Sequence, residues 1–330
     1  MVVGHQFNII LMKKNVLIAG FGSIGKRHFE GLLKSNFDIN LYIIEPFLTK
    51  RDFSKLTKKY LNINSIRTFS YIINFKVEFD LAIISTNSNI RSKILRKIIS
   101  KNYVKNLILE KILFQKYTDY NEILRLLKNK KINTWVNCPR RIYEFYKFVK
   151  KNILANEKII MDVSGSNWGI CCNSIHFIDL LDFFKKFESY KISKNNLDKK
   201  IYNSKRKNFF EFKGNFSLIT NKGDILNIYD EKSKNDQKII LIYNKKKYII
   251  DETKKTVIII HNKRKKLKKF SQSIYQSDLT NIQIDEIFNN QKSSLTNYKT
   301  SMKHHLPLIN FFLNHFNINS NSKRILCPIT

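Results

Sequence analysis

The chain has 330 residues, enough for two domains, and carries 60 Lys and Arg against 26 Asp and Glu, a net charge of +34. It has no run of about eighteen apolar residues, which excludes a membrane-spanning helix, and its four irregularly spaced cysteines favour a reducing cytoplasm over a disulfide framework. The basic excess is spread along the chain, which argues against a dedicated nucleic-acid surface and leaves a positive field that would attract anionic substrates.

The first eleven residues lack the basic start and the small-residue cleavage site of a signal peptide. Met12 and two lysines directly precede the first apolar run. Translation is therefore expected to begin at Met12, with residues 1–11 a disordered or artefactual extension.

A glycine-rich turn follows the first predicted strand. Asn15–Ala19 is a short apolar run suited to a strand buried on both faces, and Lys26–Lys34 is typical of a helix. Between them, Gly20, Gly22 and Gly25 have the spacing G-x-G-x-x-G. In that arrangement the first glycine permits a sharp turn, the second leaves the backbone open to a pyrophosphate, and the third lets helix and strand pack closely.

The surroundings of this turn predict a dinucleotide site. A second apolar run, Ile39–Ile44, ends in Glu45, twenty residues beyond Gly25, where a carboxylate would bind the adenosine ribose hydroxyls. A carboxylate there repels a 2′-phosphate, so NAD is favoured over NADP. We expect the helix start at Ser23 and Ile24 to hold the phosphates; a plain glycine turn beside a surface glutamate is the alternative.

Short apolar runs and amphipathic helical stretches alternate up to about residue 136. The further predicted strands are Ser65–Phe69, Asp80–Ser85, Asn106–Glu110 and Ile132–Val136. The predicted helices are Arg51–Leu61, Asn89–Ser100 and Asp119–Lys128. This alternation predicts a parallel, doubly wound sheet. Ligands bind such sheets at the carboxyl ends of the strands, which is where Gly20, Glu45, Thr86 and Lys111 fall.

Beyond residue 140 the pattern changes. Helices are predicted at Arg141–Lys151, Ile175–Phe184, Ile274–Asn289 and Leu295–His315, and a strand at Lys158–Val163. From residue 209 to 261, two-residue alternation broken by turn signals at 221–224, 232–236 and 245–247 predicts an open antiparallel sheet of four or five strands. The basic run 263–269 is interpreted as a solvated charged face.

We therefore expect an α/β protein with a dinucleotide-binding Rossmann domain at 12–137 and a C-terminal α/β domain at 138–330. The C-terminal domain, with its open and largely antiparallel sheet, would bind the substrate. The free face of such a sheet often forms a dimer interface, so a homo-oligomer is expected through it.

Four stretches, in this order, resemble the glucose–fructose oxidoreductase and inositol dehydrogenase (Gfo/Idh/MocA-type) family. They are Gly20-Phe-Gly-Ser-Ile-Gly25, Ser85-Thr86-Asn87, Glu110-Lys111-Ile112 and Cys172-Asn-Ser-Ile-His176-Phe-Ile-Asp179. The similarity covers about residues 12–315. It implies a Rossmann domain followed by an open-sheet domain, NAD(P)-dependent oxidation of a sugar hydroxyl, and cofactor contacts from Thr86 and Glu110.

The resemblance also implies two catalytic residues. Lys111 matches the lysine of the family's Glu-Lys-Pro motif, beside the nicotinamide and the reacting hydroxyl, where an ammonium stabilises the developing alkoxide and relays its proton. His176 matches the histidine of the Asp-x-x-x-His motif, at the start of a helix, and suits proton transfer near neutral pH. The alternatives are a surface Glu–Lys pair and a buried histidine paired with Asp179.

The chain departs from the family pattern at the motif aspartate, where Cys172 stands. A thiol is uncharged at neutral pH unless activated, which leaves the identity of the base open. Asn87 and Ile112 replace prolines, and Arg91 stands where the family commonly has histidine. A metal site at Cys171, Cys172 and His176 is not expected, because no fourth ligand is evident nearby.

Candidate substrate contacts are Arg141, Trp168, Cys172 and Asn173. The forked guanidinium of Arg141 suits a carboxylate or phosphate, although surface solvation is an equal interpretation. Trp168 would stack on a sugar ring or simply pack. The resulting hypothesis is a cytoplasmic NAD-dependent oxidoreductase of a sugar, sugar acid or nucleotide sugar, with surface polysaccharide biosynthesis suggested by family usage. A non-catalytic NAD-binding sensor or partner protein and an NAD-retaining lyase or glycosidase-type relative are the alternatives.

Overall fold

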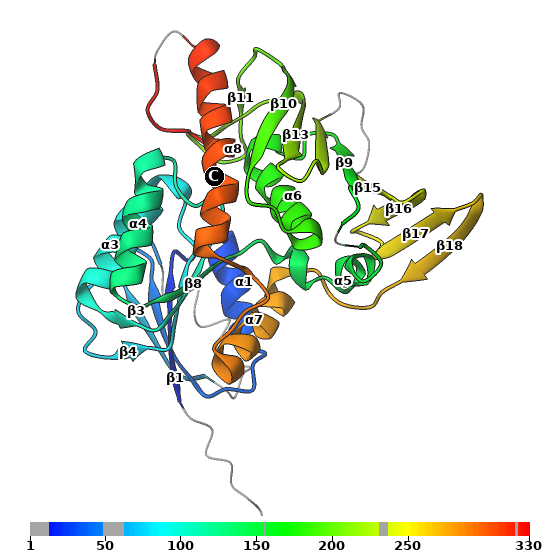
Figure 1. Cartoon of the computed structure of the whole chain (residues 1–330). Coiled ribbons are helices and arrows are strands. Elements are labelled where there is room, and N and C mark those ends of the chain that lie inside the picture. The colour runs from blue at the N-terminus through cyan, green and yellow to red at the C-terminus, as the bar shows by residue number, and fades with distance from the viewer. Residues whose placement is uncertain (1–12, 49–62, 155, 231–236, 321–322) are drawn as a thin grey trace, which may run out of the picture.

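Two sheets, each with helices packed against it, organise the protein (Figure 1). The computed structural model describes residues 13–48, 63–154, 156–230, 237–320 and 323–330. The predicted extension 1–11, the predicted helix 51–61 and the turn signal 232–236 lie outside the described residues. Among the described helices, none is long and apolar enough to cross a membrane.

The first sheet has seven strands in the order β19-β8-β7-β5-β1-β2-β3. Their bounds are β1 Lys14–Ala19, β2 Ile39–Ile44, β3 Ile63–Phe69, β5 Leu81–Ile84, β7 Asn106–Leu109, β8 Asn133–Val136 and β19 Thr296–Asn297. All neighbours pair in parallel except β19, which is antiparallel to β8. The strand order reverses direction between β1 and β5, and ligands bind doubly wound sheets at that point. The predicted Rossmann sheet is confirmed.

Helices cover both faces of this sheet. On one side lie α3 (Ser88–Lys101) and α4 (Tyr117–Asn129), and on the other α1 (Ser23–Leu32) and α7 (Gln276–Asn290), which pack together (Figure 1). The C-terminal part of the chain therefore returns to the first sheet through α7 and β19. A separate short parallel pair is formed by β4 (Glu78–Phe79) and β6 (Tyr103–Val104). The domain boundary at residue 137 stays a prediction.

The second sheet has eight described strands in the order β10-β13-β14-β9-β15-β16-β17-β18. Their bounds are β9 Ile160–Gly165, β10 Tyr190–Leu197, β13 Gly214–Thr220, β14 Ile225–Asp230, β15 Lys238–Tyr243, β16 Lys246–Asp251, β17 Thr256–His261 and β18 Arg264–Lys269. Only β14 and β9 pair in parallel among these. The sheet is therefore open and largely antiparallel, as predicted. The predicted strand number was too small, because strands outside 209–261 join the sheet.

Helices α6 (Ile170–Lys185) and α8 (Tyr298–Ile318) contact this sheet. The helix predicted to begin at residue 175 therefore begins five residues earlier. The helix predicted over 141–151 is instead split into a 3-10 turn, η2 (Pro139–Ile142), and α5 (Glu144–Lys150), because Tyr143 between them has an extended backbone. Two short strands, β11 (Tyr202–Asn203) and β12 (Phe210–Glu211), pair beside α6.

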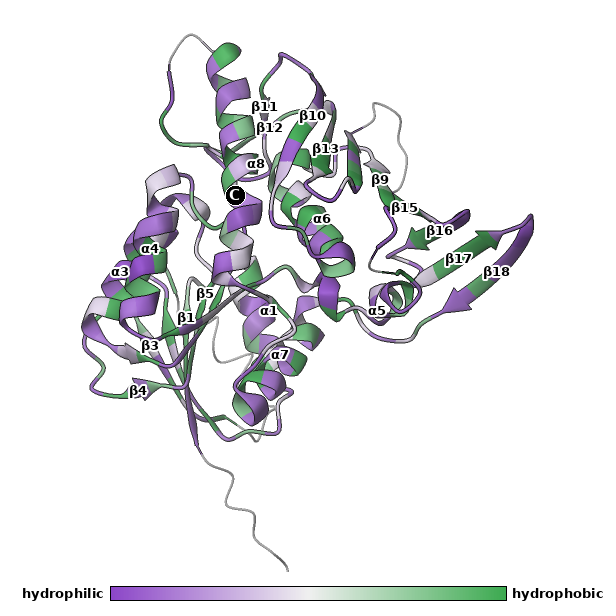
Figure 2. Cartoon of the chain, viewed as in Figure 1, coloured by the Kyte–Doolittle hydropathy of each residue, from purple (hydrophilic) through white to green (hydrophobic). Residues whose placement is uncertain are grey.

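Six of the seven residues of the basic run 263–269 form β18, the edge strand of the second sheet. All six residues of β18 are exposed, and hydrophilic residues dominate the strand (Figure 2). Lysines on an edge strand discourage pairing with another chain. The predicted solvated face is thus itself a strand, and the predicted homo-oligomer stays a prediction.

Candidate functional site

The carboxyl ends of β1, β2 and β5 open into a cavity of about 450 Å³, which we call the glycine-loop cavity. It is lined by Gly20, Gly22, Glu45 and Thr86, together with the first turns of α3. It lies at the point where the strand order reverses. Four of the residues predicted to bind a dinucleotide are therefore brought together at the position where this type of sheet binds ligands.

The three glycines of the loop have different surroundings. Gly20 has φ of +93°, and a Cβ there would lie 2.8 Å from the Thr86 nitrogen. A Cβ on Gly25 would lie 2.1 Å from the Gly20 oxygen, so a side chain would force α1 away from β1. Around Gly22, by contrast, no described atom lies within 4 Å of the Cβ position. Gly22 thus presents open backbone at the start of α1, as a bound diphosphate requires.

Glu45 connects β2 to the glycine loop. Its carboxylate accepts a hydrogen bond from the Phe21 backbone N–H at 2.8 Å and a longer one from Phe47 at 3.4 Å. Ser23 and Ile24 form the first turn of α1 beside the cavity but are not among the residues that line it. Glu45 therefore fixes the loop while remaining part of the cavity wall.

Glu110 is buried away from the glycine-loop cavity. It accepts hydrogen bonds from His28 at 2.9 Å and from Asn137 at 2.5 Å, and His28 in turn contacts Thr280 of α7. Burial raises the pKa of Glu110, but the hydrogen bond and charge of His28 outweigh it and hold that pKa below its usual range. The carboxylate therefore joins α1, β7, β8 and α7. The hydrogen bonds described for Glu110 are to other side chains of the protein.

Arg91, at the position of a family histidine, joins two loops at the site. Its buried guanidinium donates to the carbonyls of Thr86, Ile112 and Leu113, the last at 3.0 Å. Burial lowers the pKa of Arg91 to about 10. The peptide bond between Lys111 and Ile112 is cis. Through its hydrogen bonds, Arg91 holds the loop after β5 against the loop that carries Lys111.

Lys111 lies in a second cavity of about 570 Å³, the Lys111 cavity, which is also lined by Trp168, Cys172 and Asn173. The Lys111 ammonium donates to the Cys172 carbonyl at 3.1 Å and to Asn173 Oδ1 at 3.2 Å. Lys111 therefore meets three predicted residues from a distant stretch of the chain in one cavity. Of these, Trp168 is partly packed, since its indole N–H donates to the Tyr229 carbonyl at 2.9 Å.

The two candidate proton carriers on α6 are electrically neutral near neutral pH. Burial raises the pKa of the Cys172 thiol to about 11. Burial, with the charges of Lys111 and Arg140, holds the pKa of His176 well below its usual value. His176 is in the second turn of α6 rather than at the helix start, is nine-tenths buried, and does not line the Lys111 cavity. Its Nδ1 has no hydrogen-bond partner among the described residues.

Asp179 does not pair with His176. It accepts instead from the Arg141 guanidinium at 2.5 Å and from Thr296, and Arg141 also contacts Asp182 at 2.7 Å. These buried ion pairs join η2 to α6. The alternative that paired Asp179 with His176 is thereby wrong.

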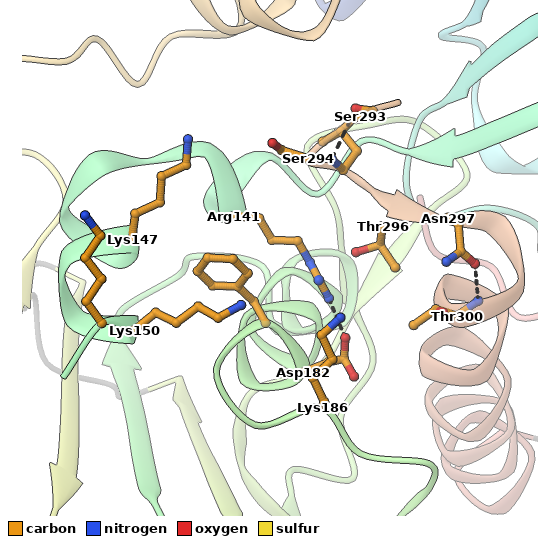
Figure 3. Close-up of a pocket in the computed structure, with 13 residues that line it drawn as sticks. Arg141, Lys147, Lys150, Asp182, Lys186, Ser293, Ser294, Thr296, Asn297 and Thr300 are labelled. Carbon is orange, nitrogen blue, oxygen red and sulfur yellow. Dashed lines mark hydrogen bonds and ion pairs between the residues drawn. The ribbon is translucent and has the colours of Figure 1, made fainter. Parts of the chain in front are cut away.

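Arg141 lines a different cavity, of about 650 Å³, formed by α5, the end of α6 and residues 293–300. In Figure 3 its guanidinium points toward Asp182, while Lys147 and Lys150 project from α5. Asp182 is ten residues beyond Cys172 on α6, a separation of about 15 Å along the helix axis. The structure therefore does not bring Arg141 to the Lys111 cavity.

Other residues of the Lys111 cavity carried no sequence signal. Among them are residues of the segment around β11 and β12, the last residue of β14 and the chain end: Tyr202, Lys205, Arg206, Glu211, Lys213, Asp230 and Thr330. Burial raises the pKa of Glu211 above the usual glutamate value, although its hydrogen bonds to Cys171 and Cys172 act in the opposite direction. No motif marks these residues, because they reach the cavity through long-range folding of short strands.

Solved structures share this arrangement over nearly the whole chain. UDP-N-acetylglucosamine 3-dehydrogenase from Acidithiobacillus ferrooxidans matches with a TM-score of 0.68 over 91% of this chain and 96% of its own, at 9% identity. Biliverdin reductase from Synechocystis sp. PCC 6803, in complex with biliverdin and NADP+, gives 0.67 over 91% and 98%, at 12% identity. A Gfo/Idh/MocA family oxidoreductase from Vibrio cholerae gives 0.68 over 93% and 100%, at 10% identity.

Neither a protein-family profile nor a curated protein matches the sequence. At identities this low, structural similarity establishes the fold, and activity has to be argued from the site. The chain has the two-part fold of the Gfo/Idh/MocA oxidoreductases, as the resemblance in its sequence predicted.

Proposed function

We propose that the protein is an NAD(P)-dependent oxidoreductase that acts on a hydroxyl of a sugar, sugar acid or nucleotide sugar. The observation that carries this proposal is the placement of two cavities beside each other. One has open glycine backbone at a helix start, and the other has an ammonium, and Arg91 joins the loops that bear them.

The glycine-loop cavity fits a dinucleotide. Gly22 leaves its backbone accessible, and the start of α1 offers amide groups and the positive end of a helix dipole to a diphosphate. Glu45 would accept hydrogen bonds from ribose hydroxyls with the carboxylate positions that Phe21 does not occupy. A negative charge at this point favours NAD over NADP, whereas the biliverdin reductase of the same fold binds NADP+.

The Lys111 cavity would hold the substrate. Lys111, Lys205, Arg206 and Lys213 line it, which supports an anionic ligand such as a sugar acid or nucleotide sugar. Trp168 and Asn173 would contact the sugar ring. One solved protein with this fold is a UDP-N-acetylglucosamine 3-dehydrogenase, which agrees with a nucleotide sugar as the substrate.

The bound dinucleotide would supply hydride acceptance, and this chain's residues would manage the charge on the substrate oxygen. As the hydroxyl proton leaves, the Lys111 ammonium would stabilise the developing alkoxide. Asn173 and the Cys172 carbonyl hold the ammonium in place by hydrogen bonds of 3.2 and 3.1 Å. Asn173 therefore positions the Lys111 ammonium and takes no direct part in the reaction.

A second candidate function is an NAD-binding sensor without turnover. The observation in its favour is the state of α6, where the Cys172 thiol stays protonated and His176 is buried and too weak a base. The oxidoreductase and the sensor differ in whether another group near Lys111 accepts the proton of the substrate hydroxyl.

Binding and turnover are measured separately. NADH fluorescence should change on mixing with the protein and saturate at one site; absence of saturable binding would refute both candidates. A screen of sugars, sugar acids and nucleotide sugars at the nicotinamide absorbance band should then identify substrates. The sensor function would be favoured if NADH binds and no compound is turned over.

The variant Lys111→Ala tests the catalytic assignment. We expect the kcat on an identified substrate to fall by about a hundredfold or more, with NADH affinity retained, because the lost ammonium acts on the substrate oxygen. Lys130→Ala, which removes an exposed lysine after α4, is the matched control and should leave kcat unchanged. Full activity of the Lys111 variant would refute its role.

A further inference from the structure

We propose that Glu211 is the carboxylate that accepts the substrate's hydroxyl proton, acting in the place where Cys172 has replaced the motif aspartate. This inference rests on the proposed function, because it names the base of that reaction. It stands on the position that β12 gives to the Glu211 carboxyl, next to Cys172 and inside the Lys111 cavity.

One oxygen of Glu211 fixes the carboxyl in place. Oε2 accepts a hydrogen bond of 2.7 Å from the Cys171 backbone N–H, in the first turn of α6. The N-cap residue of this helix is Gly169, which has no side chain to satisfy that N–H, so Glu211 does so from another strand. The amide oxygen of a glutamine could make the same contact without a charge.

The other oxygen lies near Gly169, Cys172 and Asn173, which line the same cavity. A Cβ built on Gly169 would lie 3.2 Å from Oε1 of Glu211, 3.1 Å from Sγ of Cys172 and 3.3 Å from Nδ2 of Asn173. A Cβ at Gly169 would be crowded by all three atoms, so they lie close together. Asn173 Oδ1 accepts from Lys111, while Asn173 Nδ2 donates to the Trp168 carbonyl at 2.6 Å. The Glu211 carboxyl and the Lys111 ammonium therefore belong to one group of side chains that lines the Lys111 cavity.

The proton affinities of the groups on α6 favour Glu211 over Cys172 and His176. Cys172 would have to lose a proton from a thiol with a pKa of about 11, and His176 is too weak a base. Burial gives Glu211 a pKa above that of an exposed glutamate, which makes it a stronger base. Asp230 also lines the cavity and burial raises its pKa as well, but the carboxyl that lies beside Cys172 is that of Glu211.

In the proposed step, the O–H bond of the substrate breaks and its proton passes to Oε1 of Glu211. The electron pair of that bond forms the new C=O bond. The electron pair of the C–H bond would leave as hydride to an oxidised nicotinamide dinucleotide held in the glycine-loop cavity, and reduction of that dinucleotide would balance oxidation of the alcohol. Lys111 stabilises the negative charge that develops on the oxygen between these events.

The variant Glu211→Gln tests this assignment, because it keeps the contact to Cys171 and removes the base. With NAD+ saturating and a substrate from the screen, kcat should fall by about a hundredfold. Wild-type kcat should rise with pH through the raised pKa of Glu211, since the base acts when deprotonated, and the variant should lose this acid limb. Glu122→Gln, the same change at an exposed glutamate of α4, is the control and should retain the limb.

A second measurement does not depend on turnover. In protein labelled with ¹³C-glutamate, the carboxyl resonance that disappears in Glu211→Gln should titrate above the usual glutamate pKa. A resonance that titrates at or below that value would overturn the inference whether or not a substrate is known.

The kinetic outcomes separate the two proposals. Retention of kcat and of the acid limb in Glu211→Gln would overturn the base assignment and leave the oxidoreductase intact. Absence of NADH binding by the wild-type protein would instead overturn the proposed function and, with it, the assignment of its base.

Discussion

Replacement of Gly22 by alanine would separate ligand binding from folding at the glycine loop. Gly22 has φ of −68°, which alanine adopts without strain, and no described atom lies within 4 Å of the added Cβ. The free energy of unfolding should therefore change by less than about 1 kcal/mol, because alanine restricts the unfolded chain but is a poorer N-cap residue than glycine. The added methyl group would, however, occupy the space where a diphosphate approaches the backbone.

We expect the affinity for NADH to fall by at least about tenfold, equivalent to about 1.4 kcal/mol. Fluorescence titration measures this loss, and urea unfolding measures the stability. Gly25→Ala is the matched comparison: its Cβ would lie 2.1 Å from the Gly20 oxygen, and such overpacking costs about 1–3 kcal/mol or more of stability. Unchanged NADH affinity in Gly22→Ala, with normal folding, would refute the assignment of the diphosphate to this loop.

Two further predictions concern buried charged and titratable groups. Arg91→Met should lower the free energy of unfolding by about 3 kcal/mol or more, because the buried carbonyls of Thr86, Ile112 and Leu113 lose their hydrogen-bond donor. Urea unfolding measures this loss, and a loss under about 1 kcal/mol would contradict the assigned role of Arg91. Burial lowers the pKa of His305 from 6.5 to about 3, so the unfolded state binds the proton first and stability falls as pH drops below 6.5. Relative to His305→Gln, wild-type protein should lose about 1.4 kcal/mol between pH 7.5 and pH 5.5, and equal pH dependence of the two proteins would contradict the burial argument.

The sequence by itself determined the parallel strands of the first sheet and the glycine loop, but not the antiparallel strand β19, which lies where a helix was predicted. Asn15–Ala19 and Ile39–Ile44 are apolar because parallel strands are buried on both faces, and this constraint acts on each strand separately. The positions of Gly20, Glu45 and Lys111 at strand ends follow from the same pattern, since parallel strands bring their carboxyl ends to one edge. Local periodicity and spacing are sufficient for predictions of this kind.

The tertiary structure alone decided which side chains share the Lys111 cavity. Glu211 reaches Cys171 from 40 residues away along the chain, and Arg141 turns from the predicted substrate site to the buried carboxylates of Asp179 and Asp182. His176 does not line the cavity, although it lies one helical turn beyond Cys172 on α6. These outcomes depend on contacts between distant segments, and such contacts leave no periodic or spaced signal in either segment alone.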